Sequence, residues 1–310
     1  MKSGFVSILG RPNAGKSTLL NRLVGAKIAI VADKPQTTRQ TIQGVLTRPD
    51  AQIVFLDSPG IHQPRNTLNR RMMREVKAAL EARDLLLFLA DATLPFTDAD
   101  QEAVELIRSA NTATVLALNK IDRLPRKDLL LPLIEKYREL FSFEDYIPLS
   151  AVSGEGVEEL MAVLTSRLPE GPQYFPPDHI TDQPLRHLAA ELVREKIIQF
   201  THEEIPHSTA VVVDQFQEGP KLLRLSATIY VERDGQKGII IGSKGERLKK
   251  IGSLARQEME SLFGRKVFLE LFVKVRPDWR QSESFLEALD WRRQLEARAE
   301  SPASADSSEN

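Results

Sequence analysis

The strongest constraint on the fold is a short motif near the start of the chain. Residues 10–17 read GRPNAGKS, between an apolar run at 5–9 and a segment from Thr18 that opens a helix. This is the G-x-x-x-x-G-K-[ST] phosphate-binding loop in its strand-then-helix setting. Its glycines let the backbone fold around a phosphate, and the freed N–H groups meet the positive end of the helix dipole. The motif predicts a nucleotide-binding α/β domain.

Side chains in and after this loop suit a nucleotide with Mg²⁺. Lys16 supplies a charge for the outer phosphates, and the Ser17 hydroxyl is a suitable Mg²⁺ ligand. Asp57 follows the apolar strand 52–56, where a Mg²⁺-binding carboxylate is expected. Gly60 ends that DSPG segment and offers a backbone N–H and the freedom to swing when the γ-phosphate leaves.

A threonine in the polar loop before these strands is a candidate for the remaining Mg²⁺ ligand. Thr37 and Thr38 both lie between the first helix and the second strand, and we favour Thr38.

The rest of the first half predicts a mostly parallel sheet with helices on both faces. Strands 41–47 and 52–56 are joined by a turn of hairpin length, and a helix follows at 66–83. Strands and helices then alternate, with strands at 85–91, 112–118 and 146–149 and helices at 98–108, 126–140 and 156–167. Such alternation places ligands at the carboxyl ends of the strands.

Two of those strand ends carry residues suited to reading a base. Asp122, in the segment NKID after the strand ending at 118, can accept both N1–H and the N2 amine of guanine. Adenine has no such pair of donors. Asn119 can brace the loop and the Lys120 stem can lie on the ring. Backbone N–H groups at Ser150 and Ala151, after the next strand, can meet the guanine O6.

Length and composition frame the second half. A chain of 310 residues predicts about two domains, and the lack of cysteine excludes disulfides and thiolate metal sites and fits a reducing cytosol. The start leaves no room for a signal peptide, and the longest apolar run, 85–90, is too short to cross a bilayer. We therefore expect an intracellular protein. Four prolines and a glycine within 168–178 predict a semi-stiff linker and a domain boundary.

The second half contains a glycine loop inside a local positive patch. We expect a helix at 185–200, strands at 208–215, 221–231 and 266–275, and between the last two a G-x-x-G loop flanked by short helices. Six basic residues and one acidic residue lie between 237 and 256 although the whole chain has a net charge of -1. Two glycines let the backbone approach a phosphodiester strand, and Lys244 at the tip meets its charge.

The helix after this loop is expected to turn an apolar side inward and leave Arg247 and Lys250 available to a ligand. The residues expected to be buried are Leu248, Ile251, Ala255, Met259 and Leu262. Further on, 285–295 is expected to form a short charged helix, and 301–310 to be disordered.

These motifs together resemble a known family. GRPNAGKS, TTR, DSPG, NKID and SAVSG, in this order, resemble a small GTPase domain, and residues 34–39 resemble its Era branch. Ser58 stands where that family more often has threonine, which keeps a hydroxyl. The second half is similar to a type II KH domain, and the resemblance to Era covers residues 1–277. It implies a GTPase domain at 1–170, a proline-rich linker at 171–183, a KH domain at 184–277 and a charged tail at 278–310.

The resemblance also implies site residues and ligands. GTP or GDP with Mg²⁺ is the implied cofactor, and the KH domain is expected to hold the single-stranded 3′ end of small-subunit ribosomal RNA in ribosome maturation. Lys16 and Thr38 are the expected catalytic residues, and Ser17, Thr38 and Asp57 the metal ligands. The expected nucleotide-binding residues are Gly10, Asn13, Ala14, Gly15, Lys16, Ser17, Thr18, Asp57, Gly60, Asn119, Lys120, Asp122, Ser150 and Ala151. The expected RNA-binding residues are Lys237, Gly242, Ser243, Lys244, Gly245 and Arg247.

One departure concerns catalysis. Ile61 stands directly after the DSPG glycine, where some small GTPases carry a water-positioning glutamine, and an isoleucine cannot orient water. The resemblance therefore implies slow intrinsic hydrolysis, with K⁺ held near Asn13 as one means of acceleration. It further implies a monomer and permits peripheral contact with an anionic membrane. A GTPase that assists tRNA modification and a non-enzymatic RNA-binding scaffold remain as alternatives.

Overall fold

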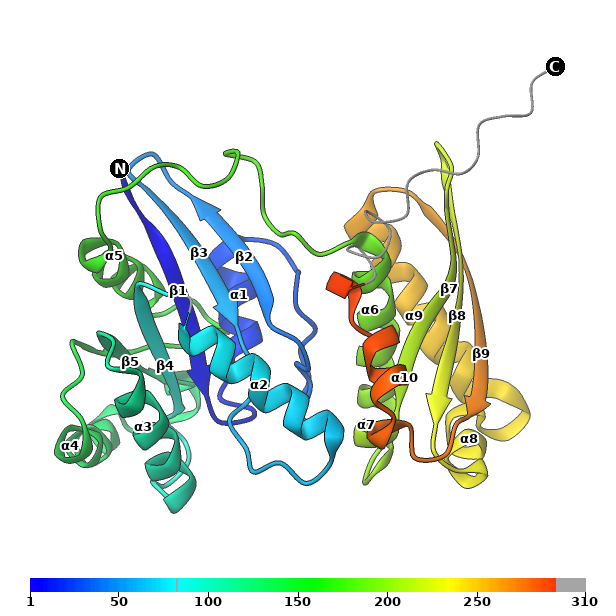
Figure 1. Ribbon diagram of the computed structural model, residues 1–310, viewed down its shortest axis with the longest axis horizontal. Helices are drawn as coiled ribbons and strands as arrows, with labels where there is room; N and C mark the ends of the chain where they lie inside the picture. The colour runs from blue at the N-terminus through cyan, green and yellow to red at the C-terminus, as the bar shows by residue number, and fades with distance from the viewer. Residues whose placement is uncertain (82, 294–310) are drawn as a thin grey trace. The chain divides into compact units, whose positions relative to one another are not determined.

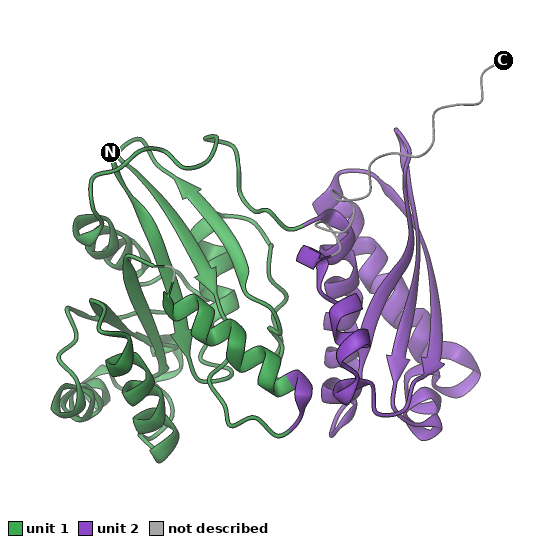
Figure 2. Ribbon diagram, viewed as in Figure 1, with its two compact units in different colours: residues 1–65, 69–183 green, residues 66–68, 184–310 purple. Residues whose placement is uncertain are grey.

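The computed structural model describes residues 1–81 and 83–293 of the chain, which divides into two compact units. Unit 1 comprises residues 1–65 and 69–183, and unit 2 comprises residues 66–68 and the chain from Pro184 (Figure 2).

Unit 1 is built on a six-stranded sheet in the order β2-β3-β1-β4-β5-β6 (Figure 1). All neighbouring strands pair in parallel except β2 and β3, which form the expected antiparallel hairpin. The strands are β1 (Lys2–Gly10), β2 (Ile42–Thr47), β3 (Ala51–Asp57), β4 (Leu85–Asp91), β5 (Thr114–Asn119) and β6 (Tyr146–Pro148). The expected mostly parallel sheet is confirmed.

Helices cover both faces of this sheet. One apolar core joins the sheet to α1 and α5, and a second joins it to α2, α3 and α4. The helices are α1 (Lys16–Val24), α2 (Thr67–Glu81), α3 (Asp98–Ala110), α4 (Leu130–Leu140) and α5 (Val157–Arg167), with short 3₁₀ helices η1 (Ile121–Arg123) and η2 (Lys127–Leu129). The expectation of one helix over 126–140 was wrong, because α4 starts only at Leu130. Pro132 explains the break, since its ring would clash with the carbonyl of Asp128 in a continuous helix.

The segment expected to be a linker lies against unit 1. Val45 on the edge strand β2 donates its N–H to the carbonyl of Ile180 at 2.7 Å, and the Thr181 hydroxyl donates to the carbonyl of Gln43 at 2.7 Å. Farther back, Gln52 Oε1 accepts the N–H of Tyr174 at 2.7 Å. The proline-rich segment therefore satisfies backbone groups at the sheet edge and belongs to unit 1.

Unit 2 has the element order that the resemblance to a type II KH domain predicts. Its three-stranded sheet has the order β7-β8-β9, with β7 antiparallel and β9 parallel to β8. Helices α6 and α9 pack together, α6 against β7 and α9 against β9. The elements are α6 (Leu185–Phe200), α7 (Ile205–Ser208), β7 (Ala210–Glu218), β8 (Leu222–Val231), α8 (Asp234–Ile241), η3 (Ser243–Gly245), α9 (Glu246–Phe263), β9 (Lys266–Val275), η4 (Trp279–Gln281) and α10 (Glu283–Ala288).

The core of unit 2 continues past residue 277. Trp279 is fully buried, and its indole Nε1–H donates to the carbonyl of Ser208 at 2.9 Å. Phe285 and Leu286 of α10 are also buried. The helix expected at 285–295 is divided in the structure: α10 ends at Ala288 and residues 291–293 are again helical, whereas residues 294–295 and the segment 301–310 lie outside the described residues.

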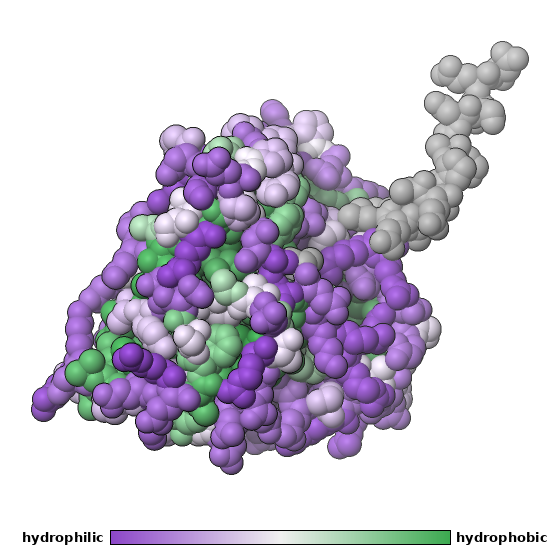
Figure 3. Space-filling view, turned by 60° about the vertical axis from the view of Figure 1, so that its left-hand side comes forward, coloured by the Kyte–Doolittle hydropathy of each residue, from purple (hydrophilic) through white to green (hydrophobic). Residues whose placement is uncertain are grey.

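The described helices give no candidate for a membrane span. None of them is both long and apolar enough to cross a bilayer. On the face shown in Figure 3, hydrophilic residues predominate and hydrophobic residues reach the surface in patches between them.

Candidate functional site

The phosphate-binding loop has the backbone conformation that its glycines predict. Gly15, at φ 98°, caps the N-terminus of α1, and Gly10 has φ 150°. A Cβ on Gly10 would lie 2.2 Å from the carbonyl oxygen of Leu89, and one on Gly15 would lie 2.3 Å from the Asn119 amide nitrogen. Any larger residue at either position would displace its neighbours. Asn13 is the non-glycine residue of the loop with positive φ, at 65°.

A cavity of about 180 Å³ opens beside this loop. Its walls come from the loop and the start of α1, from residues 30–38, from Gly60, and from the segments after β5 and β6. Most of the predicted nucleotide-binding residues line it, namely Asn13, Gly15, Lys16, Ser17, Thr18, Gly60, Asn119, Lys120, Asp122 and Ala151, as does the predicted metal ligand Thr38. The other four predicted nucleotide-binding residues are not among those that line it: Gly10, Ala14, Asp57 and Ser150.

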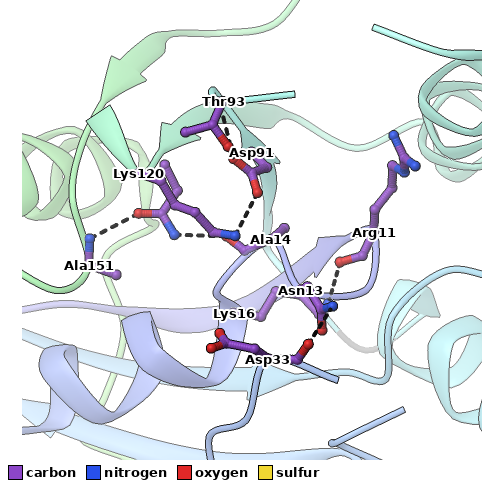
Figure 4. Close-up of polar contacts among 10 residues, drawn as sticks. Arg11, Asn13, Ala14, Lys16, Asp33, Asp91, Thr93, Lys120 and Ala151 are labelled. Atoms are coloured by element: carbon purple, nitrogen blue, oxygen red, sulfur yellow. Dashed lines mark hydrogen bonds and ion pairs between the residues drawn. The ribbon is translucent and has the colours of Figure 1, made fainter. Parts of the chain in front are cut away.

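Two opposite charges are buried at the phosphate end of the cavity. Burial lowers the pKa of the Lys16 ammonium to about 8, an effect that the Asp57 carboxylate partly opposes. Burial likewise raises the pKa of Asp57 to about 6, opposed by the charge of Lys16 and the hydrogen bond from Ser17. Lys16 Nζ donates to the carbonyl of Gly10 at 3.2 Å and to that of Arg11 at 3.1 Å, the latter drawn in Figure 4. Such perturbed groups in a cleft mark a candidate binding site for charged ligands.

Three oxygen-bearing side chains meet here in a set that suits Mg²⁺. The Ser17 hydroxyl donates to Asp57 Oδ2 at 2.6 Å and lies 2.8 Å from the Thr38 hydroxyl. The other carboxylate oxygen, Asp57 Oδ1, is buried and has no hydrogen-bond partner among the described residues. Since Mg²⁺ prefers oxygen ligands and commonly uses one or two carboxylates with waters and phosphates, the donor set fits this ion.

The two candidate threonines occupy different environments. The Thr37 hydroxyl donates to the carbonyl of Lys34 at 2.6 Å, within its own loop. Thr38 is the one that lies beside Ser17. The geometry therefore favours Thr38 for the role of metal ligand.

The base-reading segments are fixed to the phosphate-binding loop through one side chain. Asn119 donates from Nδ2 to the carbonyl of Ala14 at 2.7 Å and accepts the N–H of Ala151 on Oδ1 at 2.9 Å (Figure 4). Lys120 Nζ forms an ion pair with Asp91 at 2.6 Å. The Asp122 carboxylate is exposed in the wall of the cavity, in the short helix η1. It is thus available to accept hydrogen bonds from a base.

Asp91 was not predicted as a site residue. Burial alone raises the pKa of its carboxyl, but hydrogen bonds from Lys120 and Thr93 outweigh that effect and hold the pKa below its ordinary value. The ionised Asp91 therefore keeps the Lys120 stem in place along the cavity wall.

Arg22 is a second residue that sequence reasoning missed. From α1, its guanidinium Nε donates to the carbonyl of Ala151 at 2.5 Å, and a terminal nitrogen donates to the carbonyl of Val152. Two side chains far apart in sequence, Arg22 and Asn119, thus hold the backbone at Ala151. No local pattern marks an arginine on a helix as the partner of a loop more than a hundred residues away.

Ile61 and Asn13 bear on catalysis. Ile61 packs against the apolar core shared with α2, α3 and α4 and is not among the residues that line the cavity. The Asn13 amide donates to the carbonyl of Asp33 at 3.4 Å, which puts it beside the loop that carries Thr38 (Figure 4). The described cavity therefore has no side chain at position 61 to orient water.

The G-x-x-G loop of unit 2 exposes its backbone. Gly242, Lys244 and Gly245 have φ of 74°, 48° and 81°. A Cβ on Gly245 would meet nothing within 4 Å, so a ligand can approach the backbone there. A groove of about 360 Å³ runs from this loop between α9 and β9, lined by Gly245, Leu248, Lys249, Gly252, Ser253, Arg256, Leu269 and Leu271.

The cations around the loop differ in what they contact. Ser243 and Lys244 are exposed at the tip and Lys249 is exposed on α9, whereas Lys237 on α8 is half-buried. The Arg247 guanidinium donates to the carbonyl of Ile239, and Lys250 Nζ lies 4.4 Å from the centre of the Phe200 ring. Contrary to expectation, Arg247 is engaged within unit 2, whereas Lys250 contacts Phe200 but stays exposed.

Burial along α9 departs from the expectation at both ends. Ile251, Ala255 and Met259 are buried, but Leu248 is only half-buried, because it lines the groove, and Leu262 is 37% exposed. Leu262 lies in the last turn of α9, which ends at Phe263 before β9 begins.

Comparison with known proteins places both units in described families. The family of 50S ribosome-binding GTPases matches residues 5–120, and the KH domain family matches residues 204–280. GTPase Era of Geobacter metallireducens is 50% identical over 292 residues, which cover 94% of this chain and 98% of that protein. GTPase Era of Syntrophus aciditrophicus is 51% identical over 287 residues, 92% and 94% of the two chains.

Two crystal structures are similar over nearly the whole chain. One is Era of Aquifex aeolicus bound to GDP and AlF₄⁻, with a TM-score of 0.90. The other is Era in complex with MgGDPNP and nucleotides 1506–1542 of 16S ribosomal RNA, with a TM-score of 0.91. Each is 43% identical and covers 94% of this chain and 99% of its own.

Replacing Arg22 should loosen the base-reading loop without touching the phosphates. We predict that Arg22→Ala speeds dissociation of a fluorescent guanine nucleotide about tenfold, since two charge-assisted hydrogen bonds to the Ala151 and Val152 carbonyls are lost. Stopped-flow dissociation measures this rate. Arg48→Ala, which removes a surface ion pair with Glu158, is the matched control and should leave it unchanged. An unchanged rate in Arg22→Ala would contradict the role given to this arginine.

Proposed function

The chain belongs to the Era family of GTPases, and from that premise we propose that it binds and hydrolyses GTP and holds ribosomal RNA during maturation of the small ribosomal subunit. The observation that carries the proposal is the pairing of two sites in one chain. A cavity with buried Lys16 and Asp57 and an exposed Asp122 lies in unit 1, and an open G-x-x-G loop lies in unit 2.

In the first site, each side of the cavity serves a different part of the nucleotide. The backbone N–H groups at the start of α1 and the Lys16 ammonium bind the phosphates. Asp122 accepts the two donors of guanine, and an adenine in its place would leave the carboxylate unpaired. Asn119 and Lys120 hold this wall, and the backbone around Ala151 receives the guanine O6.

Ser17, Thr38 and Asp57 would hold Mg²⁺, with Thr38 joining when the γ-phosphate is bound. When bound, the ion would neutralise negative charge on the β- and γ-phosphates. Lys16 binds the same oxygens and stabilises the charge that develops during transfer. Loss of the γ-phosphate releases the loops of Thr38 and Gly60, which is the structural change available to a nucleotide switch.

We infer a slow intrinsic rate of hydrolysis, because Ile61 supplies no group to orient the attacking water. Asn13, at positive φ and beside the Asp33 carbonyl, is placed to hold a K⁺ ion near the transferred phosphate. Its amide oxygen is a suitable ligand for such a cation.

In the second site, the ligand is single-stranded RNA. KH domains grip about four unstacked nucleotides across a glycine loop, and the open backbone at Gly245 with Lys244 exposed at the tip suits that ligand. The similar structure that contains nucleotides 1506–1542 of 16S ribosomal RNA supports the 3′ region of this RNA as the partner. The nucleotide state in unit 1 would control binding or release. The protein acts as a monomer in the cytoplasm, where ribosomal subunits assemble, and any contact with anionic membrane is peripheral.

The guanine contact is tested by replacing one carboxylate oxygen of Asp122 with an amide nitrogen. Asp122→Asn should lower the affinity for GDP about 100-fold and make the protein prefer XDP, because the amide donates to the xanthine C2 oxygen and the paired acceptors are lost. Equilibrium titration of both nucleotides measures the change. Asp128→Asn removes the same charge nearby and should keep the GDP preference. If Asp122→Asn still prefers GDP, Asp122 does not recognise the guanine base.

The proposed K⁺ site gives a difference between salts. GTP hydrolysis in KCl should exceed that in NaCl at equal ionic strength by about tenfold, which corresponds to about 1.4 kcal/mol of transition-state stabilisation. Asn13→Gly, which tolerates the positive φ, should bring the two rates together. Asn111→Gly makes the same change at the end of α3 and should leave the difference intact. Equal wild-type rates in the two salts would refute the K⁺ site.

The RNA contact is tested at the loop tip. Lys244→Asn keeps a residue that tolerates positive φ, and it should weaken binding of a short single-stranded RNA about fivefold and reduce the salt slope by about 1. Fluorescence anisotropy at several salt concentrations measures both. Lys136→Asn on α4 is the control. The same titrations with GDP and with a GTP analogue test the switch, since equal RNA affinities would rule out nucleotide control.

A further inference from the structure

Strand β9 is an edge strand with two different faces. Its side chains alternate, and Val267, Leu269 and Leu271 point toward α9, where the last two line the G-x-x-G groove. The alternate residues, Lys266, Phe268, Glu270, Phe272 and Lys274, are all exposed and point to the opposite side of the sheet. We call this set the outer face of β9.

The outer face presents two phenyl rings to solvent. Phe268 is 46% exposed and Phe272 is 50% exposed among the described residues. They lie four residues apart on one strand, which separates them by about 13 Å. Two large aromatic side chains exposed on the same face of one strand make that face a candidate interaction site.

Cations surround these rings. Arg224 of β8 is the register partner of Phe268, and its guanidinium lies 5.6 Å from the centre of that ring. Lys266 and Lys274 lie at the two ends of the strand. Glu270, between the rings, is the acidic residue of the face. Lys266 also pairs with Glu260 of α9 at 3.5 Å. The three cations still outnumber the two carboxylates, Glu260 and Glu270, so the net charge is positive and complementary to a polyanion.

We propose that the outer face of β9 is a second RNA-binding surface, on which unpaired nucleotides adjacent to those in the G-x-x-G groove stack on Phe268 and Phe272. This inference rests on the proposed function, because it takes the groove to hold RNA. The ligand is single-stranded RNA that leaves the groove at the free edge of β9 and continues on the other side of the strand.

Continuity with the groove supports this path. Leu269 and Leu271 belong to the groove, and their immediate neighbours Phe268, Glu270 and Phe272 belong to the outer face. Within the described residues, β9 pairs only with β8. An RNA strand that lies in the groove therefore passes around one β-strand to reach the rings. The similar structure with bound RNA contains nucleotides 1506–1542, many more than the roughly four that a KH groove holds.

The chemistry of the face favours RNA over the other possible occupants. Bases stack on aromatic rings without regard to sequence, and arginine and lysine contact the phosphates between them. Glu270 can accept a hydrogen bond from an exocyclic amine of a base. A second copy of the face would oppose its positive charges.

The test compares RNAs of two lengths on the full-length protein. A five-nucleotide RNA fits the groove alone, and a twelve-nucleotide RNA extends beyond it. In the double variant Phe268→Ala with Phe272→Ala, affinity for the longer RNA should fall at least tenfold, whereas affinity for the shorter one should stay within twofold. Tryptophan at both positions should restore binding of the longer RNA. Leu262→Ala, another exposed apolar residue of unit 2, is the control and should change neither affinity.

The outcomes separate this inference from the proposed function. Equal affinities of wild type and double variant for the longer RNA would overturn the second surface, and the shorter RNA would still report on the groove. Failure of the wild type to bind either RNA would overturn both. The double variant could instead keep its RNA affinity and lose binding to anionic vesicles, or lose a dimer that the wild type forms in sedimentation. In the first case the face binds membrane and in the second it binds another copy of the chain, and in both cases the inference is wrong.

Discussion

The nucleotide site depends on two opposite charges that the parallel sheet buries at one edge. Strands β1 and β3 pair in parallel with Ile8 opposite Asp57, so the loop that follows β1 and the carboxylate that ends β3 meet at the same edge. Burial lowers the pKa of Lys16 and raises the pKa of Asp57, so it favours the neutral form of each group. Each charge is therefore only partly compensated by the other, and a bound polyphosphate with a divalent cation would complete the compensation.

The same register argument explains how distant motifs meet on the base side. Strands β4 and β5 pair in parallel with Asp91 opposite Asn119, which brings the Lys120 that follows within reach of Asp91. Asn119 then connects the phosphate-binding loop at Ala14 with the loop at Ala151. The strands behind these contacts are buried apolar segments, so the hydrophobic core fixes the geometry of a polar site.

Sequence reasoning succeeded where a site residue directly follows a strand or sits in a glycine loop. There the local pattern determines the position, as at Asp57 and the two glycine loops. It failed where a contact depends on tertiary packing. Arg22 holds a loop that is remote in sequence, and Trp279 fills the core of unit 2 from a segment that composition marks as a charged tail. Four prolines and a glycine predict a linker at 168–178, and the hydrogen bonds that tie the proline-rich segment to Gln52 and to β2 leave no periodic pattern in the sequence.

The basic run around the G-x-x-G loop shows why a count of charges overstates a nucleic-acid surface. Arg247 holds the carboxyl end of α8, Lys250 covers Phe200, and Arg256 pairs with Glu260 at 2.8 Å. The contacts of these three cations stabilise the helices that frame the groove. The exposed cations, Lys244, Lys249 and Lys250, are half of the six in the run, so counterion release at this loop is smaller than the count of charges suggests. Recognition there must therefore come largely from the open glycine backbone and from apolar contacts along the groove, which is the mode that suits unstacked nucleotides.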